Sequence, residues 1–247
     1  NNQGKLTDDI INQLENAMTL AEVEDIYRPY KQKKRTRATI AKEKGLEELA
    51  KTILAQNEKI NIYEEALLYV NKEKGVENVE DAINGAKDII SEEISDNAKY
   101  RKIIKRNCYY EGTIKTKAAN KEEKSSYEMY YDFSEKINKI PSHRILAINR
   151  GEKEEFLKVK IEKNTEKILN IIKSDLIKNN KNKYAEIIEQ CVEDSFSRLI
   201  EPSIDREIRA DLTELAEEQA IKVFGKNAKQ LLMVSPIKGK TVIGFDP

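Results

Sequence analysis

Residues 203–224, SIDREIRADLTELAEEQAIKVF, indicate the fold class of this chain. Isoleucine, leucine and alanine recur there at helical spacing between charged residues, and Pro202 stands near the start of the expected helix. Two similar segments precede it, at about 165–179 and 183–199. This pattern predicts three long helices and therefore a mostly α protein.

Shorter helices are expected upstream of these three. Thr7 followed by two acidic residues begins one helix, and the Thr19/Glu22 capping box begins a second that ends near Arg28, before Pro29. Further helices are expected over 37–44, ending at Gly45, then over 46–56, from Asn61, over 79–95, over 97–110, over 143–150, ending at Gly151, and over 226–233. We expect a multi-helix scaffold.

Strand signals are few. Residues 156–161 alternate apolar and charged side chains and form the best internal strand candidate. Residues 111–124 are polar and lysine-rich, and we expect a helix end followed by a loop there. Residues 241–247 read as a strand whose sheet is absent, so we expect that the chain was cut from a longer protein. The expected fold is mostly α with one or two short strands.

Composition limits the functional classes. Apolar residues make up 39% of the chain, which allows a core, and charged residues make up 36%, with 44 basic and 44 acidic side chains. Zero net charge lacks the basic excess of a typical nucleic-acid-binding domain, although local basic patches are compatible with it. Cys108 and Cys191 form no metal or disulfide pattern and read as free, half-buried thiols in a reducing compartment. With no signal peptide and no apolar run of about 18 residues, we expect a cytoplasmic protein without a membrane partner.

The sequence does not indicate an enzyme. His143 is the single histidine and follows Ser142 at an expected helix start, where capping or packing is the preferred role. There is no glycine-rich phosphate loop, and no cofactor or metal ion is expected. The acidic residues of 203–224 are interpreted as a solvated helix face. The aromatic run 127–133 is interpreted as packing rather than as a base-stacking platform, because acidic neighbours would repel phosphate.

One basic run is a candidate nucleic-acid contact. It contains five cations and no acid between a proline and a helix, namely Lys31, Lys33, Lys34, Arg35 and Arg37. Such a patch attracts phosphates through counterion release. A solvated loop, or pairing with acidic helices elsewhere, explains the same residues equally well, and both interpretations stay open. A second basic group over 99–106 is assigned to the helix surface.

Three segments carry a family resemblance. Residues 24–46, EDIYRPYKQKKRTRATIAKEKGL, closely resemble the signature of the bacterial Tex family of transcription accessory proteins. Residues 140–152, and then 220–224 leading into 244–247, fit the same family in the same order. The resemblance covers essentially the whole chain.

The resemblance implies a large, multi-domain, cytoplasmic factor that binds RNA or DNA. In such proteins the helical region is followed by an RNase H-like domain, helix-hairpin-helix motifs and an OB-fold RNA-binding domain. Residues 1–238 would then be the helical region and 239–247 the first strand of the RNase H-like domain. Asp246 matches the first acidic residue of active RNase H-like nucleases, but a single carboxylate is not a two-metal site.

Two functions follow as hypotheses. The first is a non-catalytic scaffold of a transcription accessory factor, which positions downstream RNA-binding domains and adds a contact through residues 31–37. The alternative is a protein-interaction module that docks the transcription machinery, with nucleic-acid binding confined to other domains.

Overall fold

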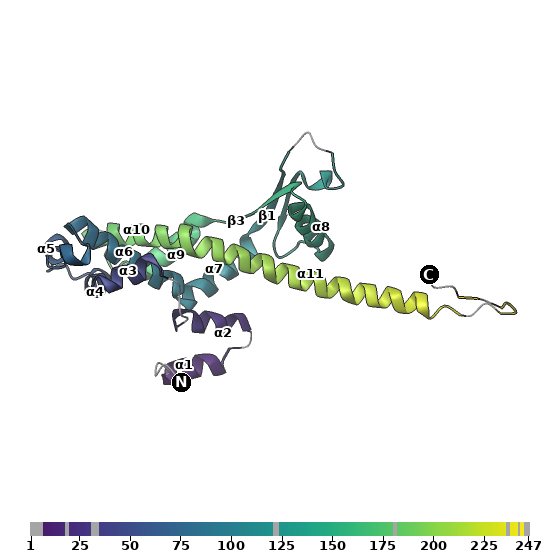
Figure 1. Cartoon of the computed structure of the whole chain (residues 1–247), viewed down its shortest axis with the longest axis horizontal. Helices are drawn as coiled ribbons and strands as arrows, with labels where there is room; N and C mark the ends of the chain where they lie inside the picture. The colour runs from purple at the N-terminus through teal and green to yellow at the C-terminus, as the bar shows by residue number, and fades with distance from the viewer. Residues whose placement is uncertain are drawn as a thin grey trace. The chain divides into compact units, whose positions relative to one another are not determined.

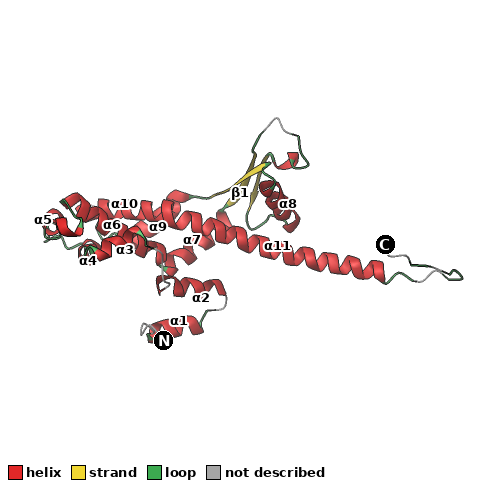
Figure 2. Ribbon diagram, in the orientation of Figure 1, coloured by secondary structure: helices red, strands yellow, loops and turns green. Residues whose placement is uncertain are grey.

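A computed structural model describes residues 7–17, 20–30, 35–120, 124–179, 182–235, 238–241 and 243–244. The chain divides into two compact units. Unit 1 comprises Asn1–Ile114, Lys136–Asn138 and Ile161–Ile208, and unit 2 comprises Lys115–Glu135, Lys139–Lys160 and Arg209–Pro247. The mostly α fold class is confirmed (Figures 1 and 2).

Unit 1 is built from helices. Its elements are α1 (Asp8–Glu15), α2 (Leu20–Tyr27), η1 (Arg28–Tyr30), α3 (Arg37–Glu43), α4 (Glu47–Ala55), α5 (Ile62–Leu67), η2 (Lys72–Lys74), α6 (Val79–Asp96), α7 (Ala98–Glu111), α9 (Thr165–Leu176), α10 (Lys183–Asp194), the π-helical segment η4 (Ser195–Ile200) and the first residues of α11 (Glu201–Leu232). These bounds confirm the predicted helices within a few residues, except at the C-terminal ends of the last three.

Helix α6 is the centre of unit 1, and α3, α4, α10 and η4 pack against it. Ala82, Ala86, Ile89 and Ile90 are fully buried in these contacts. Gly85 allows the close approach of the segment before α4, because a Cβ atom there would lie 2.3 Å from Leu46 Cδ1. The small residues of α6 therefore set how near its neighbours can come.

Polar groups inside this core are satisfied by the backbone. Ser91 on α6 donates to the Cys191 carbonyl oxygen at 3.2 Å, and Ser195 donates to the Ser91 carbonyl oxygen at 2.7 Å. Cys191 and Cys108 are free, as expected, but they are 1% and 0% exposed rather than half-buried. Both thiols behave as small apolar core residues.

Helix starts agree with the capping signals. Thr7 accepts from Ile10 N at 3.4 Å at the start of α1, and Asn61 accepts from Tyr63 N at 3.2 Å at the start of α5. Asparagines also cap α6, α7, α9 and α10. The predicted Thr19/Glu22 capping box lies outside the described residues.

Unit 2 contains most of a three-stranded antiparallel sheet in the order β2-β1-β3. The strands are β1 (Thr113–Ala118), β2 (Asp132–Lys136) and β3 (Leu157–Glu162), and η3 (Glu128–Tyr130) precedes β2. Strand β3 confirms the prediction for 156–161. For residues 111–124, the predicted helix end is confirmed at Glu111, but the predicted loop is wrong over 113–118, because buried Ile114 and Thr116 alternate with more exposed residues along β1.

Helix α8 (Ser142–Lys153) lies against one face of this sheet (Figure 2). Ile145 and Ile148 are buried, and a Cβ atom on Gly151 would lie 2.7 Å from Leu157 Cδ1 on β3. The predicted helix end at Gly151 is therefore wrong: this glycine is a packing contact within the helix. The chain turns only at Glu155, whose φ is 63°.

Two predicted helices are one in the structure. Helix α11 includes Pro202 and continues through Gly225 to Leu232, whereas the sequence predicts separate helices over 203–224 and 226–233. A Cβ atom on Gly225 would have no neighbour within 4 Å. In a helix interior, glycine is less favourable than alanine by about 1 kcal/mol, and this cost does not end the helix.

The C-terminal assignment stays a prediction. Thr241, Ile243 and Gly244 are not in a strand, while Val242 and residues 245–247, with Asp246 among them, lie outside the described residues. Within the described residues, every helix is too short or too polar to span a membrane.

Candidate nucleic-acid interface

The basic run 31–37 connects η1 to α3. Lys31, Lys33 and Lys34 lie outside the described residues. Arg35 and Arg37 are described and exposed. Arg35 forms an ion pair with Glu43 at 3.2 Å, and both side chains are more than half exposed, so this pair holds the guanidinium weakly.

Both flanks of the run are attached to unit 1. On the N-terminal side, Arg28 Nη2 donates to Glu207 Oε1 at 3.0 Å. On the C-terminal side, Thr36 caps α3 by accepting from Thr39 N at 3.1 Å, and its hydroxyl donates to Glu92 Oε2 at 2.8 Å. The run is therefore joined to the helical core at each end by a polar contact.

The N-terminal attachment uses a carboxylate that is shared by two arginines. Arg101 on α7 is 1% exposed and also binds Glu207 through Nη2, and it donates to Ser203 Oγ at 3.1 Å. The interpretation of the 99–106 basic group as helix surface is therefore wrong for Arg101. A buried guanidinium requires such a partner, since an uncompensated buried charge is strongly unfavourable.

These residues line a cleft of about 500 Å³ within unit 1. Its wall comprises Arg28, Thr36, Arg37, Ala38, Asp88, Glu92, Ser95, Asp96, Arg101, Arg198, Leu199, Ser203 and Arg206. Five arginines and three carboxylates meet there, so the cleft is a mixed ion-pair network and not a uniformly basic pocket.

Arg198 illustrates the internal pairing in the cleft. Its Nε donates to Asp194 Oδ1 at 2.9 Å, and this hydrogen bond holds the pKa of Asp194 below its ordinary value. Asp88 lies 3.6 Å from the Arg198 guanidinium, but burial dominates and raises the pKa of Asp88. Arg198 is thereby committed to carboxylates of its own chain.

Arg37 and Arg206 are the exposed arginines of the cleft. Arg206 Nε donates to the Pro202 carbonyl oxygen at 2.9 Å, and within the described ranges neither arginine forms an ion pair shorter than 4 Å. Their guanidinium groups are accessible to an external anion. At the exposed rim of the cleft, where the basic run ends, Arg37 and Arg206 can therefore contact an anionic ligand.

Acidic residues of α11 have two distinct environments. Asp205 pairs with Lys163, whose side chain is 3% exposed, and Glu207 holds the two arginines. The interpretation of a solvated acidic face is wrong for these two residues. It is confirmed for Glu214, Glu217 and Glu218, which are exposed.

The aromatic run is confirmed as a packing element of unit 2. Tyr127 and Tyr130 are 7% and 5% exposed. The Tyr130 and Phe133 rings make an edge-to-face contact at 5.3 Å, and Arg144 lies over the Phe133 ring at 5.6 Å. His143 is exposed on α8, so the expected packing role is wrong, and the helix cap is Pro141.

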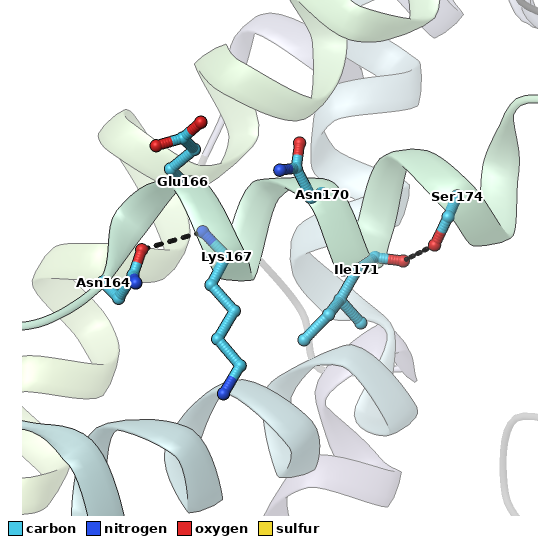
Figure 3. A pocket seen from close by; sticks show the side chains of 6 residues that line it. All are labelled: Asn164, Glu166, Lys167, Asn170, Ile171 and Ser174. Atoms are coloured by element: carbon cyan, nitrogen blue, oxygen red, sulfur yellow. Dashed lines mark hydrogen bonds between the residues drawn. The ribbon is translucent and has the colours of Figure 1, made fainter.

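A second cavity of about 600 Å³ is lined by one helix face, as Figure 3 shows. Its residues are Asn164, Glu166, Lys167, Asn170, Ile171 and Ser174. Asn164 Oδ1 accepts from Lys167 N at 3.0 Å, and Ser174 Oγ donates to the Ile171 carbonyl oxygen at 2.9 Å. The hydroxyl and the capping amide oxygen are thus used by the helix itself, and this cavity has no convergent set of catalytic groups.

The sequence alone does not predict that Arg101 and Glu207 are partners. They are separated by 106 residues along the chain and meet only because α7 and α11 fold together. The available signal was an arginine among apolar helix positions, Ile103 and Ile104 following closely, which a burial-based reading of α7 could have used.

The sequence of this chain matches a known protein family. Residues 57–224 match the family model described as Tex central region-like. The chain belongs to the Tex family. Arg101 and Glu207 lie inside the segment that matches this model, whereas the basic run precedes it.

Several relatives align with 99% of the chain. It is 48% identical to "Uncharacterized protein YdcI" of Bacillus subtilis and 32% identical to "Protein tex" of Bordetella pertussis, covering 34% and 33% of those proteins. It is 30% identical to human "S1 RNA-binding domain-containing protein 1", of which it covers 26%. The chain therefore spans about a third or less of the length of these relatives.

Proposed function

We propose that this chain is a non-catalytic helical scaffold of a cytoplasmic, nucleic-acid-binding transcription accessory factor. In this proposal it positions RNA-binding domains of the full-length protein and contributes a contact through the basic loop, defined as Lys31, Lys33, Lys34, Arg35 and Arg37. The observation that carries the proposal is the attachment of this loop at both ends, by Arg28 to Glu207 and by Thr36 to Glu92. A charged loop whose ends are attached loses less conformational entropy on binding than a free one.

The names of relatives support the transcription and nucleic-acid parts of this proposal. One relative is named "Transcriptional accessory protein Tex", from Neisseria gonorrhoeae, and another carries "S1 RNA-binding domain" in its name. The free, unpaired cysteines are consistent with the reducing cytoplasm.

Three features support a non-catalytic role. Burial raises the pKa of Cys108 to about 11 and that of Cys191 to about 12, so neither thiol is an activated nucleophile. The single histidine is exposed on α8. In the part of the chain that the structure describes, no three metal-ligating side chains are grouped to hold an ion.

The test replaces four cations of the basic loop in the whole chain, with Lys33→Ala, Lys34→Ala, Arg35→Ala and Arg37→Ala together. Binding to fluorescent RNA and duplex DNA is measured by anisotropy between ~50 and ~200 mM salt. We expect weaker binding and a salt dependence whose slope falls by about one for each lost phosphate contact. A matched control replaces Lys51, Lys59, Lys72 and Lys74, which are exposed elsewhere in unit 1. Equal affinity and slope in the two variants would remove the basic loop from the interface.

A docking function is the second candidate, favoured by exposed apolar side chains on α11. Ile221, Phe224 and Leu232 are 70%, 74% and 84% exposed. Large exposed apolar groups in series are typical of a protein contact surface. Recovery of RNA polymerase subunits from nuclease-treated extract by the wild-type chain, but not by an Ile221→Ser/Phe224→Ser variant, would support docking.

A further inference from the structure

The register of the sheet in unit 2 brings lysines from two strands together. Ala119 N donates to the Phe156 carbonyl oxygen at 2.8 Å, which makes these residues a directly opposed antiparallel pair. Two residues further along, Lys117 is opposite Lys158, and then Lys115 is opposite Lys160. We call these four residues the lysine face.

The lysine face points away from the core of unit 2. Strand β3 alternates buried Leu157 and Ile161 with exposed Lys158 and Lys160, and α8 packs on the Leu157 side. Lys117 is exposed and Lys115 is half-buried. The opposite sheet face is therefore occupied by α8, whereas the lysine face carries charged side chains toward solvent.

Acidic residues compensate these charges only in part. On β2, the bond from Ala118 N to the Tyr131 carbonyl oxygen places Asp132 opposite Lys117 and Ser134 opposite Lys115. The last row of the sheet adds Glu162 on β3 and Lys136 on β2. Among the described residues of the three strands, five lysines and two carboxylates thus lie on this side of the sheet.

Such an arrangement is unfavourable for folding by itself. Like charges directly opposite each other on neighbouring strands destabilise a sheet, and here two such pairs are adjacent. A polyanion would relieve this repulsion on binding, with release of its counterions. Charge complementarity therefore points to a phosphate backbone as the occupant of this face.

The chemistry of the face also indicates which form of nucleic acid fits. Single-strand binders combine cations with aromatic platforms on which bases stack. On this face the three strands present lysine, serine, threonine and carboxylate side chains. Phe156, in the adjoining pair with Ala119, is half-buried with its ring 5.8 Å from that of Tyr127, and Tyr127 and Tyr130 are buried. Lysine ammonium groups bind phosphates as point charges and do not read bases bidentately.

We propose that the lysine face is a sequence-independent binding surface for the phosphate backbone of double-stranded nucleic acid. It lies in unit 2, whereas the basic loop lies in unit 1, and the two surfaces have no residue in common. This proposal therefore goes beyond the function proposed above and can stand or fail separately.

The test uses the whole 247-residue chain with Lys115, Lys117, Lys158 and Lys160 each changed to Gln. The probes are two duplex DNAs of about 20 bp and unrelated sequence, and one single strand of the same length, titrated between ~50 and ~200 mM salt. We expect duplex affinity to fall about tenfold or more at the lower salt, by the same factor for both sequences, and the slope of log K against log salt to decrease by about two or more.

A matched control carries Lys→Gln at positions 51, 59, 72 and 74, so that the change in net charge is the same. A second variant, Lys117→Gln/Lys158→Gln, alters only exposed residues and is expected to show about half the loss of slope. Circular dichroism checks that each variant is folded. If the four-residue variant is unfolded, the duplex affinity of the two-residue variant tests the proposal.

The outcomes separate the two proposals. The proposal for the lysine face would be overturned if the four-residue variant bound duplex as tightly as the control variant, or if only its single-strand affinity fell. A loss of duplex affinity in the basic-loop variant alone would also overturn this proposal, and it would leave the proposed basic-loop contact intact. A loss of duplex affinity in the lysine-face variant alone would support this proposal and contradict the basic-loop contact. Failure of the unmodified chain to bind duplex DNA would overturn it outright.

Discussion

Arg101 in unit 1 and Lys158 in unit 2 are both cations on elements rich in basic residues, yet their environments are opposite. Arg101 is 1% exposed and is bound to Glu207 and Ser203. Lys158 is exposed and stands across from another lysine. The first charge is committed to the fold of its own chain, whereas the second adds repulsion to its sheet.

This difference shows that a local count of basic residues does not tell an exposed cation from a buried one. Helix α7 contains five cations over 99–106, but one of them, Arg101, is buried. Among the described residues, the number of carboxylates close to each cation follows from the folded structure and not from the sequence.

The largest expected effect is on the enclosed arginine. Glu207→Ala removes the carboxylate shared by Arg28 and Arg101 and so takes an ion-pair partner away from a buried guanidinium. We expect the free energy of unfolding to fall by about 3 kcal/mol, measured by urea denaturation. If the free energy of unfolding falls by less than about 0.5 kcal/mol, as for ordinary surface substitutions, the proposed difference between Arg101 and the exposed lysines is wrong.

A double-mutant cycle sharpens this result. Arg101→Met keeps an unbranched apolar stem and removes the charge that Glu207 compensates. The effect of Glu207→Ala is expected to be clearly smaller in the Arg101→Met background than in the wild type, because these two groups are coupled. Additive effects would show that the pair is not an energetic unit.

A smaller effect is expected from the partly exposed pair of Asp194 and Arg198. The hydrogen bond from Arg198 lowers the pKa of Asp194 in the folded protein, so the unfolded chain takes up this proton more readily. The pair therefore stabilises the fold above the ordinary aspartate pKa, and this contribution is lost as pH falls through the lower folded pKa. Asp194→Asn is expected to cost about 1 kcal/mol at pH 7.

The pH series provides the check on this pair. Wild-type and Asp194→Asn proteins are unfolded in urea at several pH values from neutral into the acid range, and their difference in stability should shrink as pH falls below about 4. Asp88→Asn is the matched comparison, because burial raises the pKa of Asp88 and the sign of its contribution is reversed. A difference for Asp194→Asn that stays constant with pH would show that Arg198 does not act through this carboxylate.

The smallest effect concerns the lysine face and has the opposite sign. Lys158→Glu places a carboxylate across from Lys117, so we expect the free energy of unfolding to rise by about 0.5 kcal/mol. Duplex binding by the same variant should fall. Lys72→Glu, at an exposed lysine of η2, is the control for the change in net charge. A loss of stability in Lys158→Glu larger than in the control would contradict the repulsion argument.

Local signals in the sequence were sufficient for most helix starts. Thr7 and Asn61 cap helices with their own side chains, and this needs information from only two or three neighbouring residues. Helix ends were less reliable because they depend on packing. The sequence predicts a helix end at Gly151, but this glycine lies inside α8, where Leu157 leaves no room for a larger side chain.

Strand β1 was missed for a related reason. Its sequence TIKTKA has only one large apolar residue, Ile114, and half of its buried face is supplied by Thr116, which bonds to the Tyr130 carbonyl oxygen. A threonine on a lysine-rich segment gives no apolar alternation to detect. Because β1 is the central strand, the lysine face could not be derived from the sequence either.

The basic loop can be recognised in the sequence as a run of charges, but its attachment to the helical core cannot. Arg28 and Glu207 are 179 residues apart, and their pairing follows from tertiary structure alone. For Arg35 and Arg37, the structure shows exposure and leaves their role in binding as a proposal.

The two buried cysteines have a kinetic consequence. A thiol that is fully covered reacts with a labelling reagent only when the surrounding helices separate, because the reactive thiolate is both scarce and inaccessible in the closed state. Cys191 lies at the contact of α10 with Ser91 of α6, and Cys108 lies on α7, so each reports on a different part of unit 1. The rates of modification of these native residues would therefore measure how often each part of the helical core opens, without any introduced probe.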